Sequence, residues 1–275
     1  MNRPQIAVAG SGLAGLHTAA HLAPAADVTV YERLPVAGGE HWQDPTHTRL
    51  VERTRRAGVR FAPGTQVIRW EGDRLLAVGS GGGLAAADAL VIATGHRPPT
   101  RAELRIDGHR CAGVVPATVA LHLLQQRVTL GVRIVVAGET EWARSCIETF
   151  TAAGASVLWV GGPAADPRAS VTARPQARVT TTHGMPRITG VTVTDGTGDE
   201  HVPCDCLVLA GPPLPYRNVD GAVLDDAPVV YAQRRGDGID DPARIGERAA
   251  REALALAQHH PRTRTAVSPR IGQPL

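Results

Sequence analysis

Three glycines near the N-terminus have the spacing of a turn that binds nucleotide phosphates. Gly10, Gly12 and Gly15 lie in the run GSGLAG, directly after the apolar stretch 6–9. In such a turn the first glycine permits a tight bend, the second lets a pyrophosphate approach the backbone, and the third lets the following helix pack closely. The N–H groups and positive dipole end of that helix then face the phosphates. This pattern predicts a phosphate-binding segment made of Gly10, Ser11, Gly12, Leu13, Ala14 and Gly15.

An acidic residue follows at the distance that a nucleotide ribose requires. Glu32 comes 17 residues after Gly15, at the end of a second apolar run from Val28 to Tyr31. An acid about 20 residues beyond the turn accepts a hydrogen bond from the ribose 2′-hydroxyl and disfavours a 2′-phosphate. An accidental glycine-rich helix entry is the alternative. The strand, helix and acid in register favour a dinucleotide-binding unit.

Other segments are expected to meet the same nucleotide. Glycines 38 and 39 follow Arg33 in a loop, and Ala93, Thr94 and Gly95 end a continuously apolar strand. A parallel strand that ends in glycine brings its loop close to a cofactor. Val67, in the alternating segment 65–70, is included in the predicted site.

The last element of this predicted site lies near the C-terminus. Gly236 and Asp237 follow the apolar run 229–231 and precede a predicted helix over 243–258. An aspartate before a helix N-terminus can hold a polyhydroxyl chain, although Asp-Gly is also an ordinary turn. The predicted helix carries small residues at 246, 249 and 250.

A second strand-helix-strand pattern begins near Val132, but its turn has lost the phosphate chemistry. Thr140 stands where the second glycine belongs, Glu139 and Glu141 add negative charge beside Gly138, and no acid follows the strand over 155–160. Gly138, Glu139 and Thr140 are therefore a possible second nucleotide site only. Loss of nicotinamide binding with retention of the fold is favoured over binding of a different nucleotide. Arginines 168 and 174 could meet a phosphate.

Composition excludes several classes of protein. The chain has 275 residues, 43% hydrophobic and 20% charged, which is typical of a globular protein, and its apolar runs are too short to span a bilayer. We expect a cytoplasmic location. The net charge of +3 comes from scattered arginines in a chain without lysine, which argues against a nucleic-acid partner. The four cysteines have neither redox nor zinc spacing and are expected to pack in the core, so no metal is predicted.

These elements predict an α/β fold of two Rossmann-like dinucleotide-binding domains, each with a small β-meander. The first domain comprises residues 1–100 and 203–260, with the strand at 206–210 marking the return of the chain. Residues 101–202 form an inserted NAD(P)-binding-like domain with a degenerate motif, closed by a hairpin or meander near 187–194. Residues 261–275 form a C-terminal tail.

Five landmarks, in this order, resemble the FAD-dependent flavoproteins of the pyridine nucleotide-disulfide oxidoreductase superfamily over residues 4–258. They are the first glycine turn, Glu32 with Gly38 and Gly39, the Ala93–Gly95 turn, the second unit, and Gly236 with Asp237. The resemblance implies that the first unit binds the ADP half of FAD and that Asp237 holds the ribityl chain. It gives no catalytic acid or base. His41 or His47, which flank the loop at Trp42, could serve as an acid or base near a flavin, but an ordinary surface histidine is the favoured interpretation of each.

The segment RCAGVVPAT at 110–118 is most similar to the FAD subunits of hydrogen cyanide synthase, opine oxidase and the heteromeric proline or hydroxyproline dehydrogenases. Those subunits act with a second flavoprotein that oxidises the amino acid. The chain departs from related proteins in three ways: it lacks a redox cysteine pair, a dimerisation domain and a cysteine-rich C-terminal extension. The stretch 214–229 is also short for the family.

The resemblance implies an FAD-binding oxidoreductase subunit of a multi-subunit amino-acid or imino-acid (amine) dehydrogenase or oxidase. As part of a hetero-oligomer it would relay electrons from a partner flavoprotein. The alternatives are a stand-alone NAD(P)H-dependent flavin reductase and a non-catalytic nucleotide-bound scaffold subunit.

Overall fold

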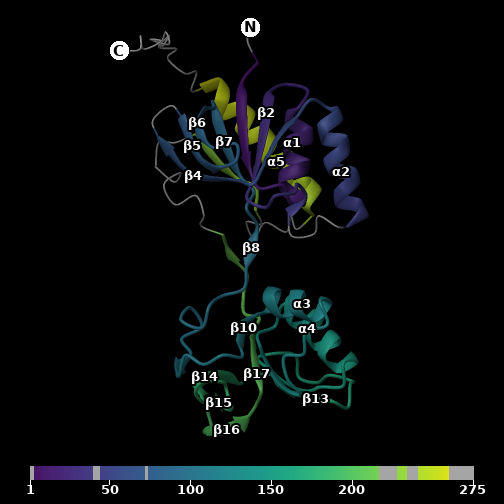
Figure 1. The fold of residues 1–275 in the computed structure, drawn as a ribbon, viewed down its shortest axis with the longest axis vertical. Helices are drawn as coiled ribbons and strands as arrows, with labels where there is room; N and C mark the ends of the chain where they lie inside the picture. Colours follow the sequence, from purple (N-terminus) through teal and green to yellow (C-terminus); the bar gives the residue numbers. More distant parts are fainter. Residues whose placement is uncertain (1–2, 40–43, 72–73, 217–227, 234–240, 260–275) are drawn as a thin grey trace, which may run out of the picture. The chain divides into compact units, whose positions relative to one another are not determined.

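The computed structural model describes residues 3–39, 44–71, 74–216, 228–233 and 241–259 (Figure 1). The chain divides into two compact units, one made of residues 1–95 and 216–275 and the other of residues 96–215. Both are α/β units built on a parallel sheet.

The first unit is centred on a five-stranded parallel sheet in the order β19-β7-β1-β2-β3. Its central strands are apolar along their whole length because both faces of the sheet are covered. The strands are β1 (Gln5–Ala9), β2 (Asp27–Glu32), β3 (Arg60–Pro63), β7 (Ala89–Ile92) and β19 (Val229–Tyr231).

Helices cover one face of this sheet. Helix α1 (Leu13–Leu22) packs against α5 (Pro242–His259) and buries the small-residue face of α5 that the sequence predicts. A Cβ at Gly246 would lie 2.7 Å from the Thr18 backbone nitrogen, so only glycine allows the two helices to approach this closely. Helix α2 (Pro45–Arg56) packs on α1 through Leu50 and Val51.

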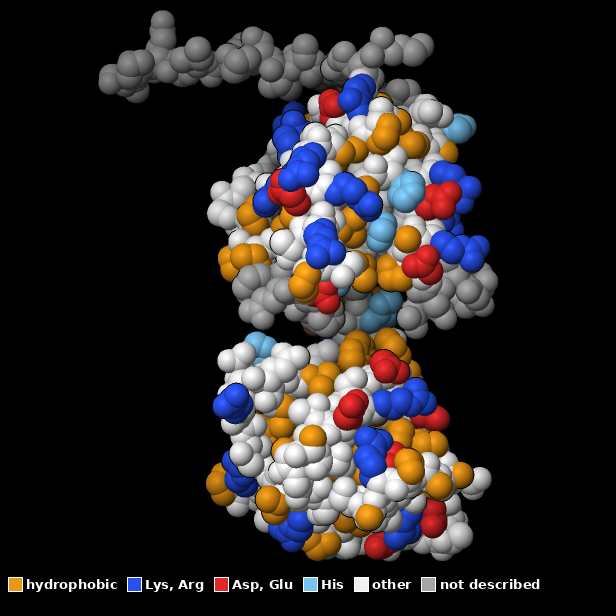
Figure 2. All heavy atoms as spheres, turned by 90° about the vertical axis from the view of Figure 1, so that its right-hand side faces the viewer, with side chains coloured by type: hydrophobic (Ala, Val, Ile, Leu, Met, Phe, Trp, Pro, Cys, Tyr) orange, Lys and Arg blue, Asp and Glu red, His pale blue; other side chains and the backbone are white. Residues whose placement is uncertain are grey.

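Helix α2 begins at Pro45, because Asp44 caps it and Pro45 fits its first turn. Its outer face carries arginines, which Figure 2 shows interspersed with acidic and apolar side chains. The opposite face of the sheet is covered by a three-stranded meander, β4 (Thr65–Glu71), β5 (Arg74–Gly79) and β6 (Gly83–Ala86).

The second unit repeats this layered plan. Its parallel sheet has the order β10-β17-β11-β12-β13, with α3 (Ala117–Gln125) and α4 (Glu141–Ala152) on one face. The other face is covered by a sheet in the order β16-β15-β14-β9, as the predicted meander requires. The strands are β9 (Asp107–Gly108), β10 (Val114–Pro116), β11 (Arg133–Ala137), β12 (Ser156–Val160), β13 (Val171–Arg174), β14 (Arg178–His183), β15 (Gly190–Thr194), β16 (Asp199–Pro203) and β17 (Cys206–Leu209).

The structure corrects one prediction about domain organisation. Strand β17 does not return to the first unit, because it pairs with both β10 and β11 inside the second sheet. The chain enters the second unit through β8 (His96–Arg97) and leaves it through β18 (Leu214–Pro215), and these two strands pair with each other. The return is then made by β19, beside β7. An apolar strand ending in glycine looks the same in either sheet, so only the pairing decides its place.

Within the described residues, no helix combines the length and apolarity that crossing a membrane would require.

Candidate functional site

The first glycine turn has the geometry that each of its glycines was expected to supply. Gly10 has φ = 101°, and a Cβ there would lie 2.4 Å from the Ala93 carbonyl oxygen. A Cβ at Gly15 would lie 2.1 Å from the Gly10 carbonyl oxygen, so α1 packs closely on the turn. At Gly12, in contrast, a Cβ would meet no atom within 4 Å. Two of the glycines are therefore required by packing, and the third faces open space.

Helix α1 begins at this open position without a side-chain cap. Gly12 is the N-cap residue, and no side chain bonds to the first-turn N–H groups of α1. Such N–H groups, together with the positive end of the helix dipole, form an anion-binding site. Leu13 and Ala14 belong to this first turn.

Glu32 is fixed beside the turn by three hydrogen bonds. Its Oε2 accepts from the Ser11 backbone N–H (2.9 Å) and from the Ser11 hydroxyl (2.6 Å), and its Oε1 accepts from the Leu34 N–H (2.8 Å). The carboxyl group is buried, with 6% of the residue exposed. The predicted ribose-binding acid is thus also the group that ties β2 to the glycine turn.

Ser11 connects the turn to the loop after Glu32. Its hydroxyl accepts a hydrogen bond from the Gly38 N–H (2.8 Å) while donating to Glu32. The neighbouring Gly39 has φ = 67°, and a Cβ there would lie 3.1 Å from the Gly12 Cα. The tandem glycines therefore lie directly against the turn. The sequence did not reveal this network, although a serine between the first two glycines is a hydroxyl that could have suggested it.

The turn formed by Ala93, Thr94 and Gly95 lies at the same end of the sheet and is joined to Tyr216. The Thr94 hydroxyl donates to the Tyr216 carbonyl oxygen (3.1 Å), and the Tyr216 N–H donates to the Gly95 carbonyl oxygen (3.1 Å). Arg33 lies with its guanidinium carbon 5.1 Å from the centre of the Tyr216 ring. Sequence reasoning missed Tyr216, whose only signal was an aromatic residue ending a proline-rich stretch.

The remaining predicted residues have different fates. Val67 lies in the first unit, where its side chain packs in the core beneath the meander with Leu75 and Leu90. Gly236, Asp237, His41 and Trp42 lie outside the described residues. His47 is buried on α2, with its Nδ1 3.8 Å from Asp44, and so is not the surface residue that the sequence suggested.

The second turn keeps the backbone frame but is occupied by the side chains of the protein itself. Gly138 has φ = 124°, and a Cβ there would lie 2.1 Å from the Ala210 carbonyl oxygen. The Thr140 hydroxyl accepts from the Ala143 N–H (3.3 Å), which caps α4, and donates to the Ala210 carbonyl oxygen (2.9 Å). Trp159 donates from its Nε1 to the Gly138 carbonyl oxygen (2.7 Å).

Acidic side chains surround this second turn. Glu139 and Glu141 lie 3.9 Å and 3.6 Å from the Arg144 guanidinium. Glu141 is in the first turn of α4, where it interacts favourably with the helix dipole and disfavours a phosphate. The cap and these charges leave the second turn poorly suited to a pyrophosphate.

The four cysteines are free and buried. Burial raises the pKa of Cys146, Cys204 and Cys206 to about 12, so these thiols do not ionise near neutral pH. Cys204 and Cys206 flank Asp205 at the start of β17, where they pack in the core.

Comparison with known proteins agrees with this geometry. Residues 1–118 match the family model described as pyridine nucleotide-disulphide oxidoreductase. A sequence search of curated proteins gives no match. Among solved structures, the thioredoxin reductase of Lactococcus lactis superposes with a TM-score of 0.69 at 16% identity, over 94% of this chain and 100% of that one.

Two further solved structures share the fold. The L-proline dehydrogenase of P. horikoshii gives a TM-score of 0.64 at 17% identity, and the NADH-bound, water-forming NADH oxidase of Lactobacillus brevis gives 0.63 at 14%. Both matches cover 94% of this chain, which spans 56% of the proline dehydrogenase chain and 70% of the oxidase chain. At these identities the likeness concerns the fold, which is Rossmann-like in both units.

Proposed function

We propose that the first unit binds FAD, with its pyrophosphate at Gly12 and the N-terminus of α1. The observation that carries this proposal is the contrast within the turn: Gly10 and Gly15 are closed by packing, whereas Gly12 faces open space at an uncapped helix end. The match of residues 1–118 to the pyridine nucleotide-disulphide oxidoreductase model supports the same assignment. Bound FAD would supply the redox chemistry, and the protein would supply its orientation and electrostatics.

Glu32 has the capacity to hold a ribose hydroxyl in addition to its internal bonds. An ionised carboxylate offers about four acceptor positions. Ser11 occupies the two on Oε2, and the Leu34 N–H occupies one on Oε1, which leaves one position on Oε1. A 2′-phosphate at this place would meet the negative carboxylate, so the unit would select a nucleotide with a free 2′-hydroxyl. Asp237, outside the described residues, is proposed to hold the ribityl chain.

The protein is further proposed to be the FAD subunit of a multi-subunit amino-acid or imino-acid dehydrogenase or oxidase, which relays electrons from a partner flavoprotein in the cytoplasm. The capped second turn supports this, because a chain that does not bind NAD(P)H must receive electrons from another donor. The free, buried cysteines offer no disulfide relay. One of the similar solved structures is an L-proline dehydrogenase.

The rival function is a stand-alone NAD(P)H-dependent flavin reductase. It is supported by the intact strand order of the second unit and by the NADH-bound oxidase among the similar structures. A nucleotide-bound scaffold subunit without catalysis is the third possibility. The three functions differ in what reduces the flavin.

The test is to purify the tagged full-length chain with its natural partners and identify its small molecules by absorption and mass spectrometry. We expect a flavin spectrum and FAD. Anaerobic addition of NADH or NADPH should leave the flavin oxidised, whereas an amino-acid substrate should bleach it in the complex only. Prompt bleaching by NAD(P)H would establish the rival function. A complex in which no donor reduces the flavin would indicate the scaffold, and a colourless protein that takes up no FAD would refute the assignment of the first turn.

A further inference from the structure

We propose that the second unit binds a small phosphate monoester with an apolar body, in a cavity separate from both glycine turns. The cavity has a volume of about 780 Å³ and is lined by the segment 100–111 and by the ends of β10 and β17. Small-molecule sites commonly measure about 300 to 1,000 Å³. Gly138, Glu139 and Thr140 do not line it. The proposal therefore does not depend on the second turn binding a nucleotide, nor on FAD in the first unit.

The cavity is bordered by arginines that lack a carboxylate partner. Arg101, Arg105 and Arg110 line it, and none of them forms an ion pair with a described residue. Arginine stays protonated at any physiological pH, so these three charges persist. Asp107 is the one acidic residue among the lining residues, which leaves an excess of positive charge.

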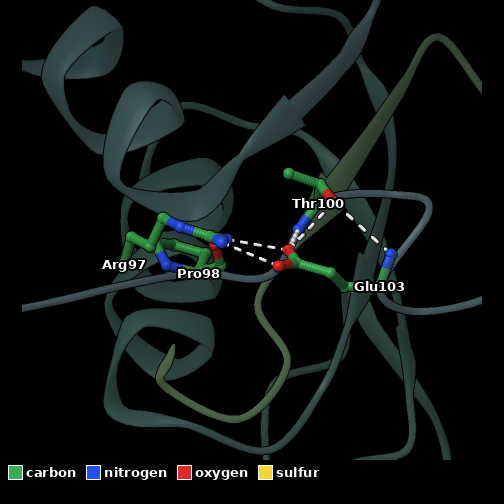
Figure 3. A network of polar contacts seen from close by, with 4 residues as sticks. All are labelled: Arg97, Pro98, Thr100 and Glu103. Carbon is green, nitrogen blue, oxygen red and sulfur yellow. Dashed lines mark hydrogen bonds and ion pairs between the residues drawn. The ribbon is translucent and has the colours of Figure 1, made fainter. Parts of the chain in front are cut away.

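Several other arginines of this unit pair with acidic side chains, whereas the three at the cavity do not. The Arg97 guanidinium donates to both carboxylate oxygens of Glu103 (2.7 and 2.8 Å), and Thr100 donates to the same carboxylate through its N–H and hydroxyl (Figure 3). These contacts hold the pKa of Glu103 at about 2. Glu103 is therefore committed to Arg97, although it is close in sequence to Arg101 and Arg105.

The two arginines that the sequence offered as phosphate ligands are paired in the same way. Arg168 pairs with Asp166 (2.5 Å), and Arg174 pairs with Glu200 (3.0 Å). Their charges are already compensated, whereas those at the cavity are not. Segment 101–110 is therefore a better candidate for an anion site than Arg168 and Arg174.

Arg101 is held in place by neutral groups. Its Nη1 donates to the carbonyl oxygens of Gly108 (3.2 Å) and His109 (2.6 Å) and to the Thr182 hydroxyl (2.9 Å). Its Nε and Nη2 make no hydrogen bond with a described residue. A guanidinium fixed on one side, with free donors on the other, is ready to bind an oxyanion.

His109 adds a further hydrogen-bond donor, and its bonding fixes which ring nitrogen carries the proton. Its Nδ1 accepts a hydrogen bond from the Gly184 backbone N–H (3.1 Å). A backbone N–H can only donate, so Nδ1 must be the acceptor. The neutral ring must therefore carry its proton on Nε2. His109 lines the cavity and presents an N–H donor in addition to the arginines.

Arg105 occupies a backbone conformation that rarely suits arginine. Its φ is 55°, in the left-handed region where glycine and asparagine are favoured. Its side chain makes no hydrogen bond or ion pair within the described part of the chain. Arg127 has a similar φ of 59° but does not line the cavity, so the position of Arg105 at the cavity, and not its backbone conformation, supports a role in binding.

The apolar floor of the cavity indicates that the part of the ligand beyond the phosphate is apolar. Ile106, Cys111, Val114 and Leu209 line it and belong to the apolar cluster between the sheet and the meander. An apolar body would cover this floor while a doubly charged phosphate met the arginines. Phosphate is preferred to carboxylate because its charge at neutral pH approaches −2, against an excess of positive groups.

The experiment uses phenyl phosphate as the probe and the full-length chain as purified, at low ionic strength, by isothermal titration calorimetry. Inorganic phosphate tests the contribution of the apolar body, and benzoate tests the need for phosphate. We expect phenyl phosphate to bind at least about tenfold more tightly than either, since both the charge and the ring contribute. Equal binding of benzoate would overturn the phosphate assignment.

The variants locate the site. Arg105→Gln with Arg110→Gln should weaken binding of phenyl phosphate by about tenfold or more, because charge-assisted hydrogen bonds are lost. Arg127→Gln with Arg178→Gln, which removes two charges elsewhere in the same unit, is the matched control and should change little. Gly12→Val should also retain binding, which excludes the first glycine turn. Undiminished binding in the cavity variant, or no binding by the native chain, would refute the proposal.

A further variant separates binding from folding. Arg105→Asn suits the left-handed backbone and should leave the Tm unchanged or raised while phenyl phosphate binding falls. A fall in Tm together with unchanged binding would show that Arg105 serves the fold and would contradict its assigned role.

Discussion

The two glycine turns of this protein share a backbone plan but differ in what occupies them. Gly10 and Gly138 both adopt positive φ, and each lies too close to a neighbouring carbonyl oxygen to tolerate a Cβ. At the position of the second glycine the two turns diverge. Gly12 leaves the end of α1 open, whereas Thr140 caps α4 with its own hydroxyl.

The acid that accompanies each turn also differs. Glu32 is bonded to Ser11 within the first turn, where it stabilises the loop and retains an acceptor position. Glu139 and Glu141 stand at the second helix start, where they meet Arg144. The comparison teaches that one backbone plan can carry either an open helix start or a helix start capped by a side chain of the protein itself.

The substitution Gly12→Val is the strongest test of the difference between the two turns. The new side chain points into the space assigned to pyrophosphate, so flavin content should fall to less than about a tenth of the native value. The fold should survive, with a cost of about 1 kcal/mol or less, because no atom lies within 4 Å of the new Cβ. Absorbance at the flavin band and circular dichroism measure the two effects. Full flavin content would show that the cofactor lies elsewhere.

Gly15→Ala should act on the fold instead. Its Cβ would lie 2.1 Å from the Gly10 carbonyl oxygen, so α1 must move away from the turn. We expect a loss of about 3 kcal/mol in the free energy of unfolding, as for other overpacking substitutions. Gly198→Ala, where a Cβ meets nothing within 4 Å, is the control. Urea denaturation of both variants distinguishes packing from a general effect of adding a methyl group.

Glu32→Gln tests the double role of the acid. The amide nitrogen must face a donor, either the Leu34 N–H or the Ser11 groups, so at least one buried hydrogen bond is lost. We expect the free energy of unfolding to fall by about 2 kcal/mol and FAD affinity to fall as well. Measuring both in one variant matters, because weaker binding without lower stability would contradict the shared network.

The stability of the second unit should depend on pH through Asp205. This carboxylate accepts from the Arg133 guanidinium and from the N–H groups of Arg133 and Val132, which lowers its pKa from 3.8 to about 2. The stabilisation is complete above the unfolded pKa and is lost as pH falls from about 4 to about 2.

The side chain of Asp205 is 28% exposed, so the loss should be about 1 to 2 kcal/mol after allowance for solvent. Asp205→Asn should remove this part of the pH dependence in urea unfolding and leave the part due to Glu103, whose pKa is also about 2. An unchanged pH profile in the variant would show that Asp205 does not contribute.

The smallest expected effect comes from Thr140→Ala, the counterpart of the first prediction. Loss of the α4 cap should cost about 1 kcal/mol. Flavin content and the response to NADH should not change, because the cap does not serve a bound nucleotide. If NADH began to reduce the flavin in this variant, the second turn would be a nucleotide site that the Thr140 cap blocks in the native protein.

The success of the sequence interpretation varied with the range of the interactions involved. The glycine spacing predicted β1, α1 and β2 because each glycine meets a local steric demand. The small residues of the C-terminal helix were also evident, but only the structure shows that they pack against α1. The strand at 206–209 was assigned to the wrong unit, because its apolar sequence suits either sheet and only pairing with β10 and β11 selects one.

The residues of the candidate site show the same difference between local and long-range interactions. Gly10, Gly12 and Gly15 were evident from spacing, since the turn is built from neighbours in the chain. The contact of Tyr216 with Thr94 and Gly95 joins residues more than a hundred positions apart, and no local pattern signals it.

The sequence by itself determined that two strand-helix-strand units are present and that only the first keeps the residues of a phosphate turn, because steric and capping preferences act over a few residues. The tertiary structure alone decided which arginines are neutralised and which remain uncompensated at the cavity of the second unit. That distinction depends on distances between side chains, and charge pairing follows proximity in space, which composition and spacing do not record.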